Sequence, residues 1–366
     1  MPVVRAHIER VARGRMCSTI ARLLGTIAAG LALAATPAVA AEGELEPEQV
    51  ALMQTAPAAS ATTIAPSNEG HAKYRLSAAT YFDEYSGDGP WIEAHVDVIK
   101  AYPPYGDVYV QYHKPVIGYH DPATQGFAPL SQPEIEAFVN QVKRDMGVGY
   151  AGVFVDDANW SFTPSPGPEA NLANLMEAIR KAEPGALIEM NSQYHDIWPK
   201  LKAGDPYVAR ALAQVNIVTK EFGVGPHAAI TTGQDYAELM TFIDMLHEKG
   251  IHVVMGGDKP NRVHTNEYTL ATCLLINDGR DFINQVNGTP AHFWKGWSVD
   301  LGSALGPRER LNGGLWTRRF TGGVVYTLEP GGTTQTIKLG KKMHSAEWGW
   351  RESITLEPEH GAVFAG

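Results

Sequence analysis

The stretch Tyr150-Ala-Gly-Val-Phe-Val-Asp156-Asp157-Ala-Asn159-Trp160 carries the clearest structural signal in the chain. Residues 151–155 are apolar and partly β-branched, which predicts a short buried strand, and two acids follow where that strand ends. Because side chains alternate along a strand, Phe154 and Asp156 should share one face and the two valines the other. A strand of this kind suits a parallel sheet that is covered by helices.

Working outward from this strand, short apolar runs alternate with amphipathic stretches. The best-defined helix shows the 3.6-residue period at Ile135, Phe138 and Val142, and Ser131 with Glu134 forms a capping box before it. Strands are predicted at residues 75–82, 107–113, 116–119, 152–156, 187–191, 215–220, 251–255 and 281–286. Helices are predicted at residues 91–101, 132–146, 169–182, 206–213, 234–249 and 266–276.

Strands separated by helices of this length indicate βαβ units and a parallel sheet. About eight such units predict a closed (β/α)₈ TIM barrel, the catalytic domain, over residues 73–308. A doubly wound nucleotide-binding sheet is less favoured, because no G-x-G-x-x-G motif follows the first strand. The runs at 107–113 and 116–119 lack a helix between them, so the second or third unit should be irregular.

The pattern changes after about residue 310. Short β-type runs at residues 316–320, 324–328, 334–339, 353–356 and 362–365 are separated by Gly, Pro and charged turns. Residues 309–366 are therefore predicted to form a small antiparallel β-sandwich domain after the barrel.

The N-terminal segment has the features of an export signal. Five arginines precede or flank an apolar run at residues 23–35, and Ala38-Val-Ala40 is a typical cleavage motif. We therefore expect a signal peptide at residues 1–40, a flexible lead-in at residues 41–72, and a secreted or periplasmic protein. No other apolar run is long enough to cross a bilayer, so no membrane span is expected in the mature protein.

The charge balance also limits the partners. The chain holds 30 Lys and Arg against 40 Asp and Glu, a net charge of −10, and removal of residues 1–40 leaves 25 against 39, or −14. Such an acidic protein is not expected to bind nucleic acid. We expect a monomer.

Cysteine and histidine patterns argue against several chemistries. Cys17 would leave with the signal, so Cys273 would be alone and is predicted to be a buried small hydrophobe. Neither H-E-x-x-H nor G-x-S-x-G occurs, so no metal, no cofactor and no serine nucleophile are predicted.

In a barrel, reactive groups lie at the carboxyl ends of the strands. Asp156 ends the predicted fourth strand and Glu221 ends the sixth, so both should border the same opening. Two carboxylates are what glycoside hydrolysis requires: one stays ionised as nucleophile or base, and the other donates a proton to the leaving oxygen. We assign Asp156 to the first role and Glu221 to the second, with Asp157 in reserve.

Other polar and aromatic residues at strand ends are predicted to bind the substrate. Amides, hydroxyls and carboxylates suit the many directional hydrogen bonds of a sugar, and aromatic rings can stack on it. The predicted substrate-binding residues are Tyr81, Asp83, Tyr112, His113, Asn159, Trp160, Asn191, Gln193, His195 and Asp258.

These motifs resemble those of known barrels. Gly152-Val-Phe-Val-Asp156-Asp157 resembles the G-[VF]-x-x-D segment of retaining α-glycosidase barrels, whose nucleophile is that Asp. It is more similar to the D-G-V-F-L-D-D of a family of glycosyl-hydrolase-like bacterial (β/α)₈ barrels, with Ala151 in place of the first Asp. Thr219-Lys-Glu221-Phe-Gly resembles their sixth-strand acid, and Leu356-Glu-Pro-Glu-His-Gly-Ala-Val363 the closing strand of their β-domain. The resemblance spans residues 75–366.

The leading hypothesis is therefore an exported glycoside hydrolase that acts on a poly- or oligosaccharide. Three alternatives remain open on the sequence. The chain could be a non-catalytic carbohydrate-binding barrel, a metal-dependent deacetylase or phosphodiesterase, or a structural envelope protein whose acids only cap loops.

Overall fold

The computed structural model describes residues 77–82, 94–103, 107, 110–111, 114–122, 130–156, 158, 168–192, 194–220, 223–224, 229–256, 265–285 and 294–366. All of them belong to one compact unit, residues 51–366. The barrel elements, in chain order, are β1 (Ser77–Phe82), β2 (Val98–Ala101), β3 (Val116–His120), α4 (Gln132–Val148), β4 (Gly152–Val155), α5 (Pro168–Ala182), β5 (Leu187–Asn191), α6 (Tyr194–Lys202), α7 (Pro206–Leu212), β6 (Ile217–Lys220), α8 (Gly233–Glu248), β7 (His252–Gly256), α9 (Thr265–Ile276) and β8 (Phe282–Gln285).

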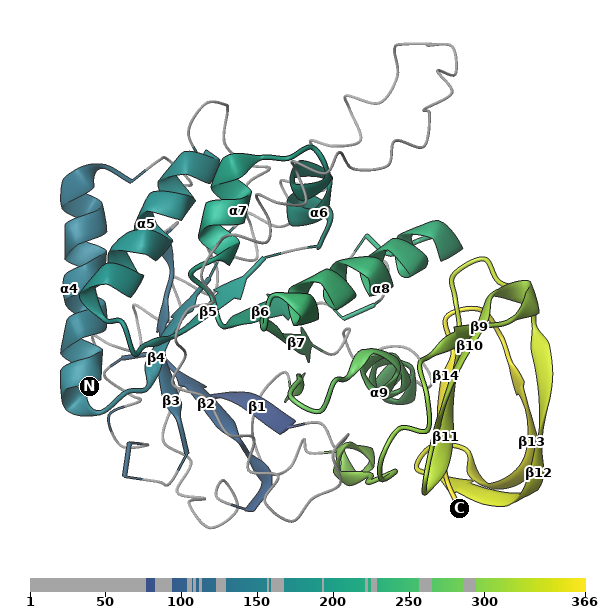
Figure 1. The fold of residues 1–366 in the computed structure, drawn as a ribbon. Helices are drawn as coiled ribbons and strands as arrows, with labels where there is room; N and C mark the ends of the chain where they lie inside the picture. The colour runs from purple at the N-terminus through teal and green to yellow at the C-terminus, as the bar shows by residue number, and fades with distance from the viewer. Residues whose placement is uncertain are drawn as a thin grey trace, which may run out of the picture. The chain divides into compact units, whose positions relative to one another are not determined.

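Strands β1 to β8 pair in sequence order, all parallel, and β1 also pairs with β8, which closes the barrel (Figure 1). The helices α4, α5 and α8 lie outside it. The alternation predicted for the fourth strand is confirmed, because Phe154 packs in the inner cluster and Val153 and Val155 pack against the helices. The (β/α)₈ barrel predicted from the strand spacing is thus the observed fold.

The second barrel unit differs from the prediction. Residues 91–101 were expected to form a helix, but Val98–Ala101 is strand β2, which pairs with both β1 and β3. The strand predicted at 107–113 is also wrong at its described positions, where Asp107 is in a 3₁₀ turn and residues 110–111 are in a turn. The β-branched pair Val98-Ile99 favours a strand, and Pro103 helps to end it, whereas the apolar spacing before it imitates a helix.

Local signals set the helix ends. Helix α4 begins after Ser131, whose backbone N–H and hydroxyl both donate to the Glu134 carboxylate, and it ends at Gly149, whose φ of 118° few other residues adopt. Helix α6 was not predicted, because Pro199 lies inside it and proline normally argues against a helix.

After the barrel come the 3₁₀ helix η5 (Lys295–Ser298), β9 (Glu309–Arg310), the 3₁₀ turn η6 (Asn312–Gly314), β10 (Leu315–Phe320), β11 (Gly323–Leu328), β12 (Gln335–Ser345), β13 (Gly349–Leu356) and β14 (Gly361–Ala365). The six strands form one antiparallel sheet in the order β13-β12-β14-β11-β10-β9, as expected for a β-domain after the barrel. The sheet curls over its own core, in which Leu328, Ile354 and Phe364 are buried (Figure 1).

Helix α9 packs against β10, β11 and β14. The buried Tyr236 hydroxyl of α8 lies 2.8 Å from the Thr272 hydroxyl of α9 and 2.9 Å from that of Thr327 in β11. Cys273 is fully buried in α9, as predicted. The boundaries predicted for the two domains stay predictions.

The predicted signal peptide and lead-in, residues 1–72, lie outside the described residues. Within the described ranges, none of the helices combines the length and the apolar character that crossing a bilayer requires.

Candidate active site

Asp156 follows β4 at the carboxyl-end opening of the barrel, and side chains from the two neighbouring strands hold its carboxylate. The Tyr119 hydroxyl of β3 donates to Oδ2, and the Asn191 amide of β5 donates to Oδ1 at 2.7 Å. Its own backbone N–H donates to the His120 carbonyl at 2.9 Å. Asp156 is half-buried whereas Tyr119 and Asn191 are buried, so a fixed carboxylate faces the opening.

Tyr119 is itself held by neighbouring rings. Its ring centroid lies 4.1 Å from that of Tyr102, after β2, and 5.4 Å from that of Phe154. Burial raises the pKa of the Tyr119 phenol far above its usual value, and the nearby Asp156 charge raises it further. The hydroxyl therefore keeps its proton and acts as a donor to Asp156.

A charged layer lies inside the barrel. Lys100 of β2 forms an ion pair with Glu189 of β5, and the Thr219 hydroxyl of β6 donates to the same carboxylate oxygen. Lys100 and Glu189 are both fully buried, and the Lys100 ammonium lies 4.8 Å from the Phe154 ring centroid. Because Phe154 also contacts Tyr119, this layer supports the residues that hold Asp156.

Two polar side chains in the interior have atoms that make no hydrogen bond to any residue that the structure describes. One is Oε2 of Glu189, and the other is the amide of Asn284 in β8, of which neither the oxygen nor the nitrogen is bonded. Asn284 is 1% exposed and pairs in register with Gly256 of β7. Buried polar atoms are normally satisfied, so these atoms leave unused donor and acceptor capacity inside the barrel.

The helix side of β6 carries a second polar group. Lys220 is buried there, 5.9 Å from the Tyr194 ring centroid, and burial lowers its pKa to about 7 in spite of the Asp196 charge. Glu221 is the next residue and lies outside the described ranges. His195, predicted to bind substrate, is exposed on α6, where its Nε2 lies 3.7 Å from a carboxylate oxygen of Asp196.

Among the predicted site residues, Asp156 and Asn191 are brought together. Tyr81 lies in β1, where its backbone pairs in register with Lys100. Tyr102 was not among the predicted site residues, because residues 91–101 were expected to form a helix. The other predicted site residues lie outside the described residues and stay predictions: Glu221, Asp157, Asp83, Tyr112, His113, Asn159, Trp160, Gln193 and Asp258.

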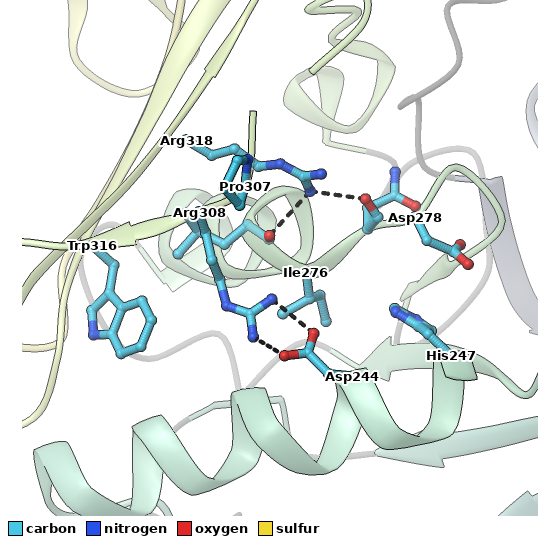
Figure 2. A pocket seen from close by; sticks show the side chains of 10 residues that line it. Asp244, His247, Ile276, Asp278, Pro307, Arg308, Trp316 and Arg318 are labelled. Atoms are coloured by element: carbon cyan, nitrogen blue, oxygen red, sulfur yellow. Dashed lines mark hydrogen bonds and ion pairs between the residues drawn. The ribbon is translucent and has the colours of Figure 1, made fainter. Parts of the chain in front are cut away.

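A pocket of about 630 Å³ lies at the opposite end of the barrel, between α8, the turn after α9 and β10 (Figure 2). Arg308 pairs with Asp244 through two hydrogen bonds, and Arg318 donates to backbone carbonyls at the end of α9. The charges that line it are thus already paired with protein groups.

One group near this pocket has the spacing of metal ligands within the described part of the chain. It comprises His247, Asp278 and Asp281, whose ligand atoms lie within 4.8 Å of one another. His247 bonds Asp281 at 2.9 Å, and Arg280 bonds Asp278. Burial lowers the pKa of His247, but its hydrogen bond to Asp281 and nearby carboxylates raise it more. His247 and Arg280 therefore already engage the two carboxylates, which favours a structural cluster.

Comparison with known proteins finds solved structures that match at low sequence identity. No protein-family model and no curated protein matches the chain. A family 39 glycoside hydrolase from Bacteroides cellulosilyticus WH2 matches with a TM-score of 0.48 and 11% identity, over 80% of this chain and 81% of that one. The glycoside hydrolase domain of PelA from Pseudomonas aeruginosa matches with a TM-score of 0.41 and 17% identity, over 59% of this chain and 95% of that one. A psychrophilic glycoside hydrolase family 10 endo-β-1,4-xylanase matches with a TM-score of 0.40 and 14% identity, over 61% of this chain and 89% of that one. Each of these three proteins is described as a glycoside hydrolase or as a domain of one.

Proposed function

We propose that the protein is an exported glycoside hydrolase that cleaves a poly- or oligosaccharide with two carboxylates. The observation that carries this proposal is Asp156, a carboxylate held at the barrel opening by the Tyr119 hydroxyl and the Asn191 amide. Catalytic groups must be held in one geometry to act, and a hydroxyl and an amide from the adjacent strands do this here.

In this proposal Asp156 is the nucleophile, or the base that activates water, on one face of the sugar ring. Glu221 donates the proton to the leaving oxygen. Thr219 points into the barrel and Lys220 toward the helices, so strand alternation assigns the next inward position to Glu221. An inward side chain at that position would border the same opening as Asp156, two strands away.

We infer that the remaining polar residues at the strand ends bind sugar hydroxyls. Asn191, which was predicted to bind substrate, orients Asp156 in this proposal.

The test is sugar release from a panel of bacterial and plant polysaccharides by the protein and its variants. Glu221→Gln should lower the rate by about 10²–10⁴-fold, and Asp156→Asn by at least as much, because each removes a group that acts in the transition state. Glu136→Gln, on the exposed face of α4, is the matched control and should leave the rate unchanged.

Three outcomes would overturn the proposal. Equal sugar binding by all variants without any release would indicate a carbohydrate-binding protein. Loss of activity with a chelator would indicate a metal-dependent hydrolase. Unchanged release by both acid variants would remove Asp156 and Glu221 from the mechanism.

A further inference from the structure

A single tryptophan of the C-terminal sheet is turned to solvent. Trp350 of β13 is 59% exposed, and it pairs across the strands with His344 of β12. Their ring centroids lie 5.2 Å apart at an interplanar angle of 60°, an edge-to-face contact. Backbone pairing and this contact hold the indole in place, so little side-chain freedom would be lost when a ligand stacks on it.

His344 also borders a pocket of about 210 Å³ between α9, η5 and the sheet. Its other walls include Trp294, Lys295 and Ser298, and α9 supplies the buried Glu267. Aromatic faces and scattered donors are therefore continuous from Trp350 through His344 into this pocket. Strands β12 and β13 form the part of the sheet farther from α9 (Figure 1).

The charge around this surface differs from that of the whole chain. Lys342, two residues before His344 in β12, is exposed, as is Lys295 at the pocket, whereas Glu352 is the exposed acid nearest to Trp350 in sequence. The chain as a whole has a net charge of −10. A local excess of cations on an acidic protein attracts an anionic ligand.

The composition of the surface distinguishes among possible partners. Insertion into a membrane needs several apolar side chains together, and a stable protein interface needs a larger apolar centre than one indole. Stacking on a flat ring with donors around it suits a sugar. We propose that Trp350, His344 and the adjoining pocket bind an acidic polysaccharide, at a second site outside the barrel opening.

The test is affinity electrophoresis of the full chain in gels that contain polygalacturonate, alginate or uncharged hydroxyethylcellulose. One or both acidic polymers should retard the protein, and the neutral polymer should not. Trp350→Ala should weaken the retardation about tenfold, since an exposed aromatic anchor is lost. Tyr207→Ala removes another exposed aromatic residue, 41% exposed on α7, and should bind as the parent does. Near-ultraviolet circular dichroism and thermal unfolding check that the variants fold.

The proposal is overturned if neither acidic polymer retards the protein, if Trp350→Ala binds as well as the parent, or if hydroxyethylcellulose binds equally. The proposal is also overturned if the protein floats with vesicles of phosphatidylglycerol and phosphatidylcholine but is not retarded by the polymers, because the surface would then bind lipid. The assay does not depend on the proposed hydrolysis, because the Asp156→Asn protein should bind as the parent does. Sugar release without Trp350-dependent binding would support the proposed hydrolase and overturn the second binding site. Trp350-dependent binding without sugar release would support the second site and not the proposed hydrolase.

Discussion

At the scale of single residues, the site is organised around the contacts of Asp156. Tyr119 and Asn191 lie in the strands on either side, and each occupies one oxygen of the carboxylate. The Tyr119 ring is fixed by Tyr102 and Phe154, so its hydroxyl can be removed without disturbing the packing. The contribution of that hydrogen bond is therefore measurable by a conservative change.

Tyr119→Phe should lower kcat of sugar release by about 10–100-fold, because the carboxylate loses a charge-assisted hydrogen bond that orients it. The KM and the melting temperature should change little, since the ring and its contacts remain. Tyr207→Phe, on an exposed ring, is the control. Equal kcat values for the two variants would exclude a positioning role for Tyr119.

At the scale of the elements, buried charges join strands that are distant in the chain. Lys100 in β2 and Glu189 in β5 face each other across the barrel interior, where neither is accessible to water. A buried ion pair adds little net stability by itself, but removal of one partner leaves the other charge buried and uncompensated. Replacement of either Lys100 or Glu189 alone should therefore destabilise the barrel.

Glu189→Gln should lower the free energy of unfolding by about 3–5 kcal/mol, as measured by urea denaturation, because Lys100 loses its counter-charge. The double variant Lys100→Met/Glu189→Met should recover much of this loss, since both charges are then gone. A double variant less stable than Glu189→Gln would show that the pair itself stabilises the barrel.

Lys220, at the end of β6, should make stability depend on pH. Burial lowers its pKa to about 7 in the folded protein, whereas an unfolded lysine titrates near a pKa of about 10.4. Between these values the unfolded chain binds a proton that the folded chain lacks, so stability rises with pH, by at most about 1.4 kcal/mol per pH unit. Below pH 7 both states are protonated and the full penalty of burial remains.

Lys220→Met should therefore be more stable than the parent at pH 7.5, and the difference should shrink toward pH 9.5. Urea unfolding at the two pH values measures this. Because other lysines titrate equally in both proteins, only the difference between them is informative. Parallel pH profiles would mean that Lys220 is charged in the folded protein across this range.

At the scale of the whole molecule, buried contacts join the barrel to the C-terminal sheet. Glu267, in the first turn of α9, is fully buried and accepts hydrogen bonds from the Ser345 hydroxyl, the Glu347 N–H and the Val363 N–H. These donors belong to the end of β12, the turn after it, and β14. One carboxylate thereby satisfies three groups of the sheet that would otherwise be buried without a partner.

Glu267→Ala should cost about 2–4 kcal/mol in the free energy of unfolding, because two backbone N–H groups and a hydroxyl lose their acceptor. Urea denaturation followed by tryptophan fluorescence measures the change, and Glu136→Ala on exposed α4 is the control. If the two variants were equally stable, water would have replaced the carboxylate and this contact would not couple the sheet to the barrel.

The sequence by itself determined the barrel and the position of Asp156 at the end of the fourth strand. Both follow from local patterns: the alternation of strands with helices along the chain, and the alternation of side chains between the two faces of a strand. The fourth strand, Phe154 inward and Asp156 at its end could be derived from residues 150–160 alone. The C-terminal sheet could be predicted for the same reason, since its strands are short runs with turn residues between them.

Only the tertiary structure decided which groups act together. Strand β2 was mistaken for a helix because its few residues gain their pairing from β1 and β3, not from local propensity. The hydrogen bonds of Asp156 to Tyr119 and Asn191 span 37 and 35 residues, and the Lys100–Thr219 contact spans 119. Such contacts depend on the pairing of the strands into a barrel, which brings distant parts of the chain together in space, and no local pattern in the chain records it.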